Sequence, residues 1–204
     1  MVNMFLKTIS GIWPMLLIVS VIISTIRITY LVYNKKKIEI HKELLMFFFI
    51  VYILLLYYIV TFQDNNYGTN NFVPFKEMLR YNVNSTLFIK NVLGNIVLFI
   101  PLGLFVSLYI KNKSFFITFI LSFIISCSIE YVQSLIGRTV DIDDVILNTT
   151  GGLVGYIIYK LVNRFAYKLP KFMRKAIFLD ILSLLFVLAI MYMAIKTEFW
   201  RYLS

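Results

Sequence analysis

The sequence has one cysteine, one histidine and few acidic residues, and each of these scarcities excludes a class of function. Cys127 stands alone, so the chain cannot form an internal disulfide. The single histidine, His41, lies in a short basic connection between apolar segments, which removes most hydrolytic mechanisms that need an imidazole base. Low-complexity linkers and polar stretches long enough for a soluble domain are also missing, so we expect one membrane-embedded chain.

Apolar residues, in contrast, are abundant. They make up 60% of the chain, aromatic residues make up 17%, and the mean hydropathy of +0.84 is well above that of soluble proteins. Hydrophobic segments of about 20 residues recur along the sequence, each long enough to cross a bilayer as a helix. The sequence therefore predicts an all-α polytopic membrane helix bundle with about six transmembrane helices, over Ile9–Tyr33, Leu44–Phe62, Val92–Ile110, Phe115–Ile136, Val145–Leu161 and Ala176–Ile195.

The net charge of +10 does not indicate nucleic-acid binding, because the basic residues lie in short loops between apolar segments. They concentrate in 34–42, at Lys111 and Lys113, and in 160–175, which are connections on one side of the predicted bundle. Basic loops stay preferentially in the cytoplasm. We therefore expect a multi-pass protein of a bacterial cell membrane with both termini outside.

Three regions are predicted along the chain. Residues 1–43 hold the first transmembrane helix and a basic cytoplasmic loop, 44–163 form a membrane domain of four helices, and 164–204 hold a second basic loop and the last helix. The longest connection lies within the second region, and after Pro74 it alternates apolar with charged residues. That pattern suits a short helix in the outer headgroup region, although an ordinary surface turn has the same composition.

Polar residues gather at the predicted outer end of the bundle. Glu130 is the most informative, because a carboxylate within a membrane helix costs about 2.5–3.5 kcal/mol at the centre unless it is paired or hydrated. Gln133 follows on the same helix face, and Arg138 comes directly after that helix. The sequence predicts one shared ligand-binding pocket, formed by Asn95, Glu130, Gln133, Arg138, Asp141, Asp144 and Asn148.

Other roles for these residues stay open. Polar side chains also hydrogen-bond membrane helices together without binding a ligand. Asp143 and Asp144 are suited to the start of a helix, where carboxylates meet the positive end of its dipole. With Asp141 they are also weak candidates for a divalent-cation site, although we expect no metal or other cofactor.

Two packing predictions concern the remaining polar and small residues. Gly151, Gly152 and Gly155 offer a face on which a neighbouring helix packs closely. Arg27 and Asp180 lie at comparable depth in the first and last predicted helices, so we expect an ion pair between them.

The polar pattern resembles the VanZ-like family of small bacterial membrane proteins. The matching segments are 71–75, 91–103, 130–133 and 138–155, so the resemblance covers roughly 44–160 and leaves out the first and last helices. It implies a cell-envelope role connected with resistance to the glycopeptide teicoplanin. Its expected partners are membrane lipids and a lipid-linked cell-wall precursor or lipoglycopeptide, with no nucleic acid.

Three functions are compatible with these residues. The first is a cell-envelope protein that binds a lipid-linked or amphiphilic ligand at the outer polar pocket, with Arg138 on an anionic head group. The second is a membrane-embedded enzyme that acts on a lipid substrate through carboxylate or metal chemistry, with Glu130 as the candidate catalytic base. The third is a small transporter in which Glu130 relays protons. We favour the first, which is not enzymatic.

Overall fold

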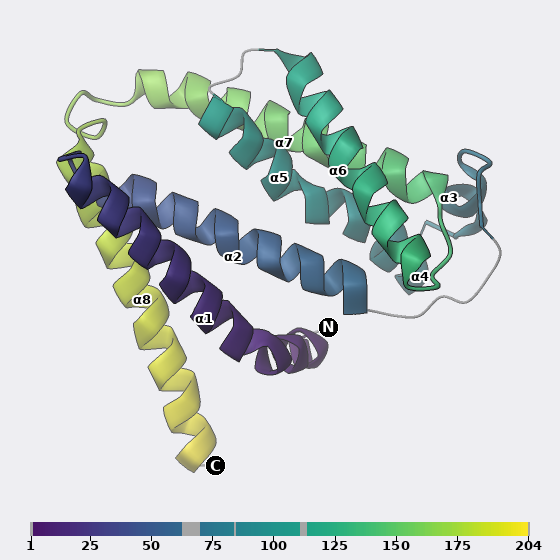
Figure 1. The fold of residues 1–204 in the computed structure, drawn as a ribbon, viewed down its shortest axis with the longest axis horizontal. Helices are drawn as coiled ribbons and strands as arrows, with labels where there is room; N and C mark the ends of the chain where they lie inside the picture. Colours follow the sequence, from purple (N-terminus) through teal and green to yellow (C-terminus); the bar gives the residue numbers. More distant parts are fainter. Residues whose placement is uncertain (1, 63–69, 84, 111–113, 204) are drawn as a thin grey trace. The chain divides into compact units, whose positions relative to one another are not determined.

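The computed structural model describes the backbone of residues 2–62, 70–83, 85–110 and 114–203, and the side chains of 14–59, 70–83, 85–110, 114–189 and 192. These residues form an all-α membrane helix bundle (Figure 1). The helices are α1 Val2–Tyr33, α2 Ile40–Phe62, α3 Lys76–Arg80, α4 Thr86–Phe88, a π-helical turn η1 Ile89–Leu93, α5 Gly94–Ile110, α6 Phe115–Leu135, α7 Ile142–Lys168 and α8 Ala176–Leu203.

Every predicted hydrophobic helix has a counterpart in the structure. Five segments of the described residues are long and apolar enough to cross a bilayer, in α1, α2, the α4–α5 stretch, α6 and α7. In α8 the described apolar part, Ala176–Ala189, is shorter than a full crossing, so the sixth crossing stays a prediction. Helix α7 is longer than predicted at both ends. It starts on the acidic run at Ile142, and it continues past Leu161 as a more polar helix to Lys168.

Two compact units divide the chain. Unit 1 comprises Met1–Val51 with Ala166–Ser204, and unit 2 comprises Tyr52–Phe165. Helix α2 contributes its first half to unit 1 and its second half to unit 2.

Unit 1 corrects one prediction about ion pairs. Arg27 pairs with Glu43 in the first turn of α2, through hydrogen bonds of 2.9 and 3.1 Å to its two carboxylate oxygens. Asp180 instead accepts the backbone N–H of His41 at 2.8 Å and contacts the His41 ring at 2.7 Å. The predicted Arg27–Asp180 pair is therefore wrong. The prediction compared only the depths of Arg27 and Asp180 in the membrane. It did not consider that the first N–H groups of α2, which have no partner inside the helix, attract the Asp180 carboxylate.

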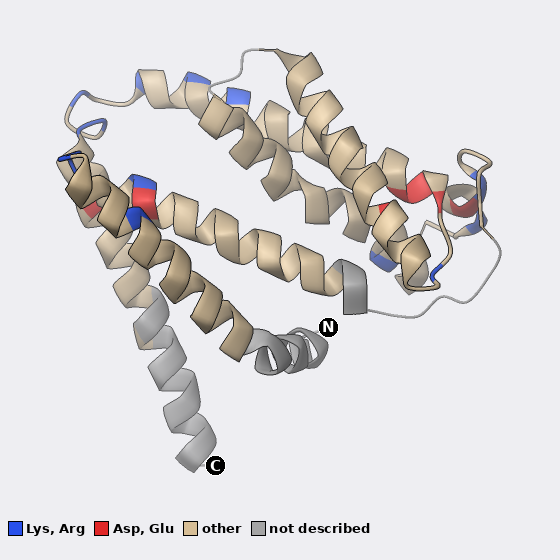
Figure 2. Ribbon diagram, in the orientation of Figure 1, with Lys and Arg blue, Asp and Glu red and all other residues tan. Residues whose placement is uncertain are grey.

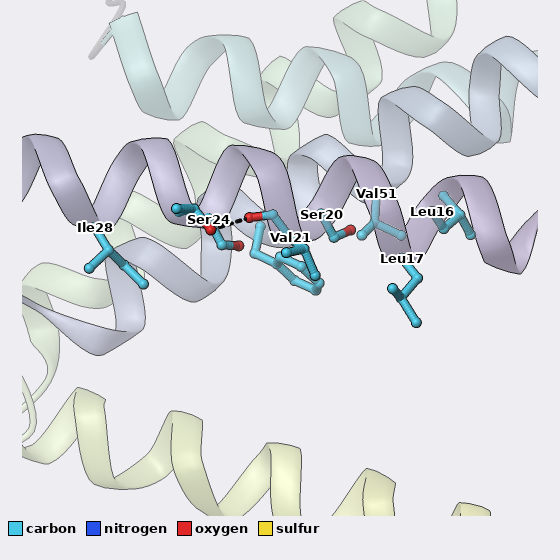
Figure 3. Close-up of a pocket in the computed structure, with 9 residues that line it drawn as sticks. Leu16, Leu17, Ser20, Val21, Ser24, Ile28 and Val51 are labelled. Atoms are coloured by element: carbon cyan, nitrogen blue, oxygen red, sulfur yellow. Dashed lines mark hydrogen bonds between the residues drawn. The ribbon is translucent and has the colours of Figure 1, made fainter.

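A groove also runs along α1 and α2 in unit 1, with a volume of about 530 Å³ (Figure 3). Leu17, Val21 and Ile28 of α1 and Val51 of α2 contribute to its apolar wall, and Ser20 and Ser24 add hydroxyl groups. All of its lining residues are apolar or hydroxyl-bearing and lie in membrane-spanning helices. Hydrocarbon is the natural neighbour of such a surface.

Close packing between α5 and α7 organises unit 2, where α5, α6 and α7 lie together (Figure 1). A Cβ atom on Gly103 of α5 would come within 1.8 Å of the carbonyl oxygen of Gly152, so the two backbones touch. Gly151 and Gly155 approach the carbonyl oxygens of Ile96 and Ile100 in the same way. The predicted small-residue face of α7 is confirmed, and this packing fixes α7 beside the helices that carry the polar residues.

Candidate functional site

The turn between α6 and α7 places Arg138. Gly137 has a φ of +80°, which a glycine adopts without strain, and it ends α6. Its N–H donates to the carbonyl of Ser134, while the N–H of Arg138 donates to the carbonyl of Gln133 at 3.0 Å. These two bonds form a Schellman motif. The sequence Ile136-Gly137-Arg138 therefore fixes the backbone of Arg138 directly after the end of α6.

The long connection docks onto this turn through Asn71. Its backbone N–H donates to Val140 and its carbonyl accepts from Ile142, which makes a parallel bridge opposite Asp141. The Asn71 amide also donates to the Asp141 carboxylate at 2.8 Å. Asn71 is only 7% exposed, so these bonds are shielded from competing water. The connection is thus part of the site.

Asp143 holds the short helix α3. Its carboxylate, only 1% exposed, accepts the backbone N–H groups of Phe75, Glu77 and Met78. These donors include the first N–H groups of α3, which have no partner inside the helix. Phe75 adopts a φ of +65°, a conformation that a bulky residue takes only when its surroundings enforce it. The predicted helix after Pro74 is confirmed, and Asp143 fixes its position.

Two further carboxylates near this loop, those of Glu130 and Asp144, accept hydrogen bonds from neighbouring segments. Glu130, 4% exposed, accepts the backbone N–H of Asp141 at 2.9 Å. Asp144 accepts a short hydrogen bond from the Asn95 amide of α5. The positive charge of Arg138 interacts with both Glu130 and Asp144. We call Asn95, Glu130, Arg138, Asp141 and Asp144 the polar cluster.

Outside the membrane-spanning segments, the electrostatics of the cluster are clearest at Asp141. Burial raises the pKa of the Asp141 carboxyl above its usual range. The N–H of Asp143, at 2.9 Å, and the Asn71 amide act in the opposite direction, because both donate to the charged form. Figure 2 shows the acidic residues of unit 2 gathered at this end, where α7 begins beside α3. The polar cluster therefore combines three carboxyl groups with one cation, Arg138, whose charge acts on Glu130 and Asp144.

The structure divides the predicted pocket into two levels. Asn95 bonds to Asp144, Glu130 bonds to the backbone of Asp141, and the charge of Arg138 acts on both Glu130 and Asp144. Asn148 is one turn deeper, where its amide donates to Ser126 at 3.0 Å. Gln133 is 8% exposed, and its backbone carbonyl serves the Schellman motif.

The three aspartates do not converge on one point. Asp141 faces Asn71, Asp143 faces α3, and Asp144 faces Asn95. Among the residues that the structure describes, no group of three His, Cys, Asp or Glu side chains is placed to hold a metal ion. The cation site considered for these aspartates is not supported, because each carboxylate serves a different element.

Sequence reasoning missed two members of the site. The sequence indicates Asn71 only as part of the shared segment 71–75, and Asp143 only as a helix start or a cation ligand. Both roles depend on partners about 65–70 residues away in the chain, such as Asn71 with Asp141. The signal that the sequence offers is the length of this connection, because long loops within compact proteins are often functional.

Around α3 the site has an apolar and cationic rim. Phe72, Val73, Phe75 and Leu79 are 68%, 59%, 53% and 83% exposed, as are many apolar side chains of the membrane-spanning helices. Lys76 and Arg80 are exposed on α3 between them. We call these six residues the α3 rim. Apolar side chains mixed with cations suit the boundary between lipid tails and anionic head groups.

Comparison with known proteins points to one family. The family model described as VanZ/LLP1 matches residues 48–163. The protein named VanZ from Enterococcus faecium is 36% identical over 101 residues, which cover 48% of this chain and 62% of that protein. The match thus spans less than two thirds of the relative's length. No solved structure matches the chain.

Proposed function

The chain belongs to the VanZ-like family, and on that premise we propose that it is a cell-envelope protein that contributes to resistance against teicoplanin-type glycopeptides by binding an amphiphilic or lipid-linked ligand. The ligand site is the polar cluster together with the α3 rim. The observation that carries the proposal is the position of Arg138, a cation that follows a Schellman motif and whose charge interacts with the buried carboxylates of Glu130 and Asp144.

The chemistry of the two parts suits an amphiphile. Arg138 offers a planar guanidinium that binds phosphate or carboxylate through paired hydrogen bonds. The apolar side chains of the α3 rim provide a neighbouring surface for an acyl or prenyl tail, with Lys76 and Arg80 available to the head group. Asp143 keeps α3 beside the cluster, so the head-group and tail surfaces stay adjacent.

The site faces outward in this proposal. Segments 34–42 and 160–175 carry 10 of the 20 Lys and Arg residues, a charge bias that favours the cytoplasmic side for both. The polar cluster lies at the opposite ends of α6 and α7 from the second of these loops. Glycopeptides and exposed cell-wall precursors are found on that outer side.

Drug susceptibility tests the proposal. In a teicoplanin-sensitive Gram-positive host, expression of the unaltered chain is expected to raise the inhibitory concentration of teicoplanin above that of empty vector. Arg138→Ala should return it to the vector value, because the head-group contact is lost. Arg164→Ala is the matched control, since it removes an arginine from the far end of α7.

Membrane levels of all three proteins must be equal by immunoblot. Equal teicoplanin susceptibility for empty vector and the unaltered chain would contradict the resistance role. Full resistance in Arg138→Ala would contradict the ligand site.

A further inference from the structure

The apolar groove along α1 and α2 runs toward the end of α1 at which a basic connection begins. On α1 it extends from Leu16 to Ile28, which at a rise of about 1.5 Å per residue is roughly 18 Å. One leaflet contributes about half of the ~30 Å hydrocarbon core of a bilayer. The groove therefore matches the depth of one leaflet, and with it the length of one extended lipid tail.

Polar and cationic side chains lie at the Ile28 end of the groove. Arg27, next to Ile28 in the chain, pairs with Glu43 of α2. Just beyond it, the Lys36 ammonium donates to the Tyr30 hydroxyl at 2.9 Å and lies 4.9 Å from the centroid of the Tyr30 ring. Tyrosine is common at the level of lipid head groups, because its ring is apolar and its hydroxyl is polar. A cation bound to an interfacial tyrosine is thus present where the apolar groove ends.

The turn after α1 fixes the backbone of Lys36. Lys35 adopts a left-handed φ of +49°, and its N–H donates to the carbonyl of Val32. The N–H of Lys36 donates to the carbonyl of Leu31 at 2.9 Å. Together these bonds form a Schellman motif. The three consecutive lysines, Lys35 to Lys37, therefore follow the helix end directly and stay near the groove.

The connection before α8 adds cations to the same end of unit 1. Asp180 of α8 bonds to His41, and the charge of Lys37 also acts on the Asp180 carboxylate. Lys175 directly precedes α8, roughly 7.5 Å along the helix axis from Asp180. Figure 2 shows Lys and Arg on both connections. We call six exposed cations of these connections the basic platform: Lys35, Lys36, Lys37, Lys171, Arg174 and Lys175.

The charge of this end is strongly unbalanced. Segments 34–42 and 166–175 hold eight Lys and Arg residues and one acidic residue, Glu39, which pairs with Lys42 at 2.6 Å. Clusters of four to eight cations beside membrane-spanning helices attract anionic lipid head groups. The basic platform therefore complements a phosphate, while the groove complements a hydrocarbon tail.

We propose that the α1–α2 groove and the basic platform together bind one anionic phospholipid. Its tail lies along the groove, and its phosphate lies at Lys36 and Tyr30, with the other platform cations around the head group. The Tyr30 hydroxyl accepts from Lys36 and donates its own proton to the phosphate. This site belongs to unit 1 and is independent of the polar cluster, which belongs to unit 2.

Native mass spectrometry of the full chain in detergent tests the site. Dioleoyl phosphatidylglycerol, which is anionic, is compared with dioleoyl phosphatidylcholine, which has the same tails and no net charge. The unaltered chain is expected to bind phosphatidylglycerol about tenfold more tightly, because several cations surround the head group. Glycerol 1-phosphate, a head group without tails, should not displace it.

Three variants separate the two parts of the site. Lys36→Gln should weaken phosphatidylglycerol binding about fivefold and leave phosphatidylcholine binding unchanged. Lys90→Gln is the matched control, since it makes the same change at an exposed lysine of unit 2, and neither lipid should bind differently. Ser24→Phe places a ring in the groove (Figure 3) and should weaken both lipids alike.

Equal monodispersity of all variants in detergent shows that lost binding is not a lost fold. Equal binding of the two lipids to the unaltered chain would overturn the proposal, as would unchanged phosphatidylglycerol binding in Lys36→Gln or in Ser24→Phe. Displacement by equimolar glycerol 1-phosphate would contradict it in favour of a site for free phosphate. A lipid-free dimer would contradict it in favour of a second copy of the chain on the groove.

Discussion

At the scale of single residues, Asp143 contributes most to the shape of the site. One buried carboxylate accepts three backbone N–H groups, which is the reason a helix of only five residues is held in place. Isolated helices of this length are not stable in water, because the conformational entropy lost in forming the first turn exceeds the free energy gained from its few hydrogen bonds. Without Asp143, α3 would lose its main attachment to α7.

Protease cleavage tests this role. In Asp143→Asn the side-chain NH₂ replaces one acceptor oxygen, so at least one of the three N–H donors, on Phe75, Glu77 and Met78, is left unpaired, at a cost of about 2 kcal/mol. We expect trypsin to cut after Lys76 and Arg80 much faster in this variant, as followed by mass spectrometry of protein in detergent micelles.

Glu77→Gln is the control for this prediction. It changes a carboxylate of α3 whose ion pair with the exposed Arg80 is worth little, so its cleavage rate should equal that of the unaltered chain. Equal cleavage rates in Asp143→Asn and the unaltered chain would show that α3 is held by other contacts.

Prediction from sequence succeeded for residues whose burial follows from the membrane alone. Glu130 is buried and paired because lipid does not solvate a carboxylate. It failed where the partner depends on how distant segments meet. Arg27 pairs with Glu43 rather than Asp180, and Asp143 faces α3 rather than a cation. Composition and spacing within one helix carry no information about such partners.

At the scale of elements, the glycine contacts between α5 and α7 support the geometry of the site. Asn95 reaches Asp144 only because α5 and α7 touch through Gly103 and Gly152, about two turns deeper. The glycine pattern of α7 made its close packing predictable. The matching position on α5 was not predictable, because Gly103 is an isolated glycine that follows Pro101.

A single methyl group tests this contact. In Gly103→Ala the new Cβ would lie 1.8 Å from the Gly152 carbonyl oxygen, so the helices must separate, at a cost of about 1–3 kcal/mol. We expect a lower midpoint of thermal unfolding in detergent than for the unaltered chain.

Gly94→Ala is the matched control, since its new Cβ would meet its nearest neighbour at 3.7 Å, an ordinary contact. The midpoint of this variant should not fall. If both variants unfold at the same temperature as the unaltered chain, the α5–α7 contact is looser than described.

At the scale of the whole molecule, orientation in the membrane links structure to function. Five segments of the described residues are able to cross the bilayer, and every acidic residue described in unit 2 lies at one end of it, at Glu77, Glu130, Asp141, Asp143 and Asp144. The helical fold and its spans followed from hydropathy and length. The direction of insertion is inferred from charge, and the proposed ligand is accessible only if this end faces outward.

Cysteine labelling in intact cells tests this orientation most directly. In a Cys127→Ser background, Val83→Cys lies in the α3–α4 connection beside the site, and Lys171→Cys lies in the α7–α8 connection; both positions are exposed. A membrane-impermeant maleimide is expected to label Val83→Cys in intact cells and Lys171→Cys only after lysis. Labelling of Lys171→Cys in intact cells, with Val83→Cys protected until lysis, would place the polar cluster in the cytoplasm and contradict the proposed function.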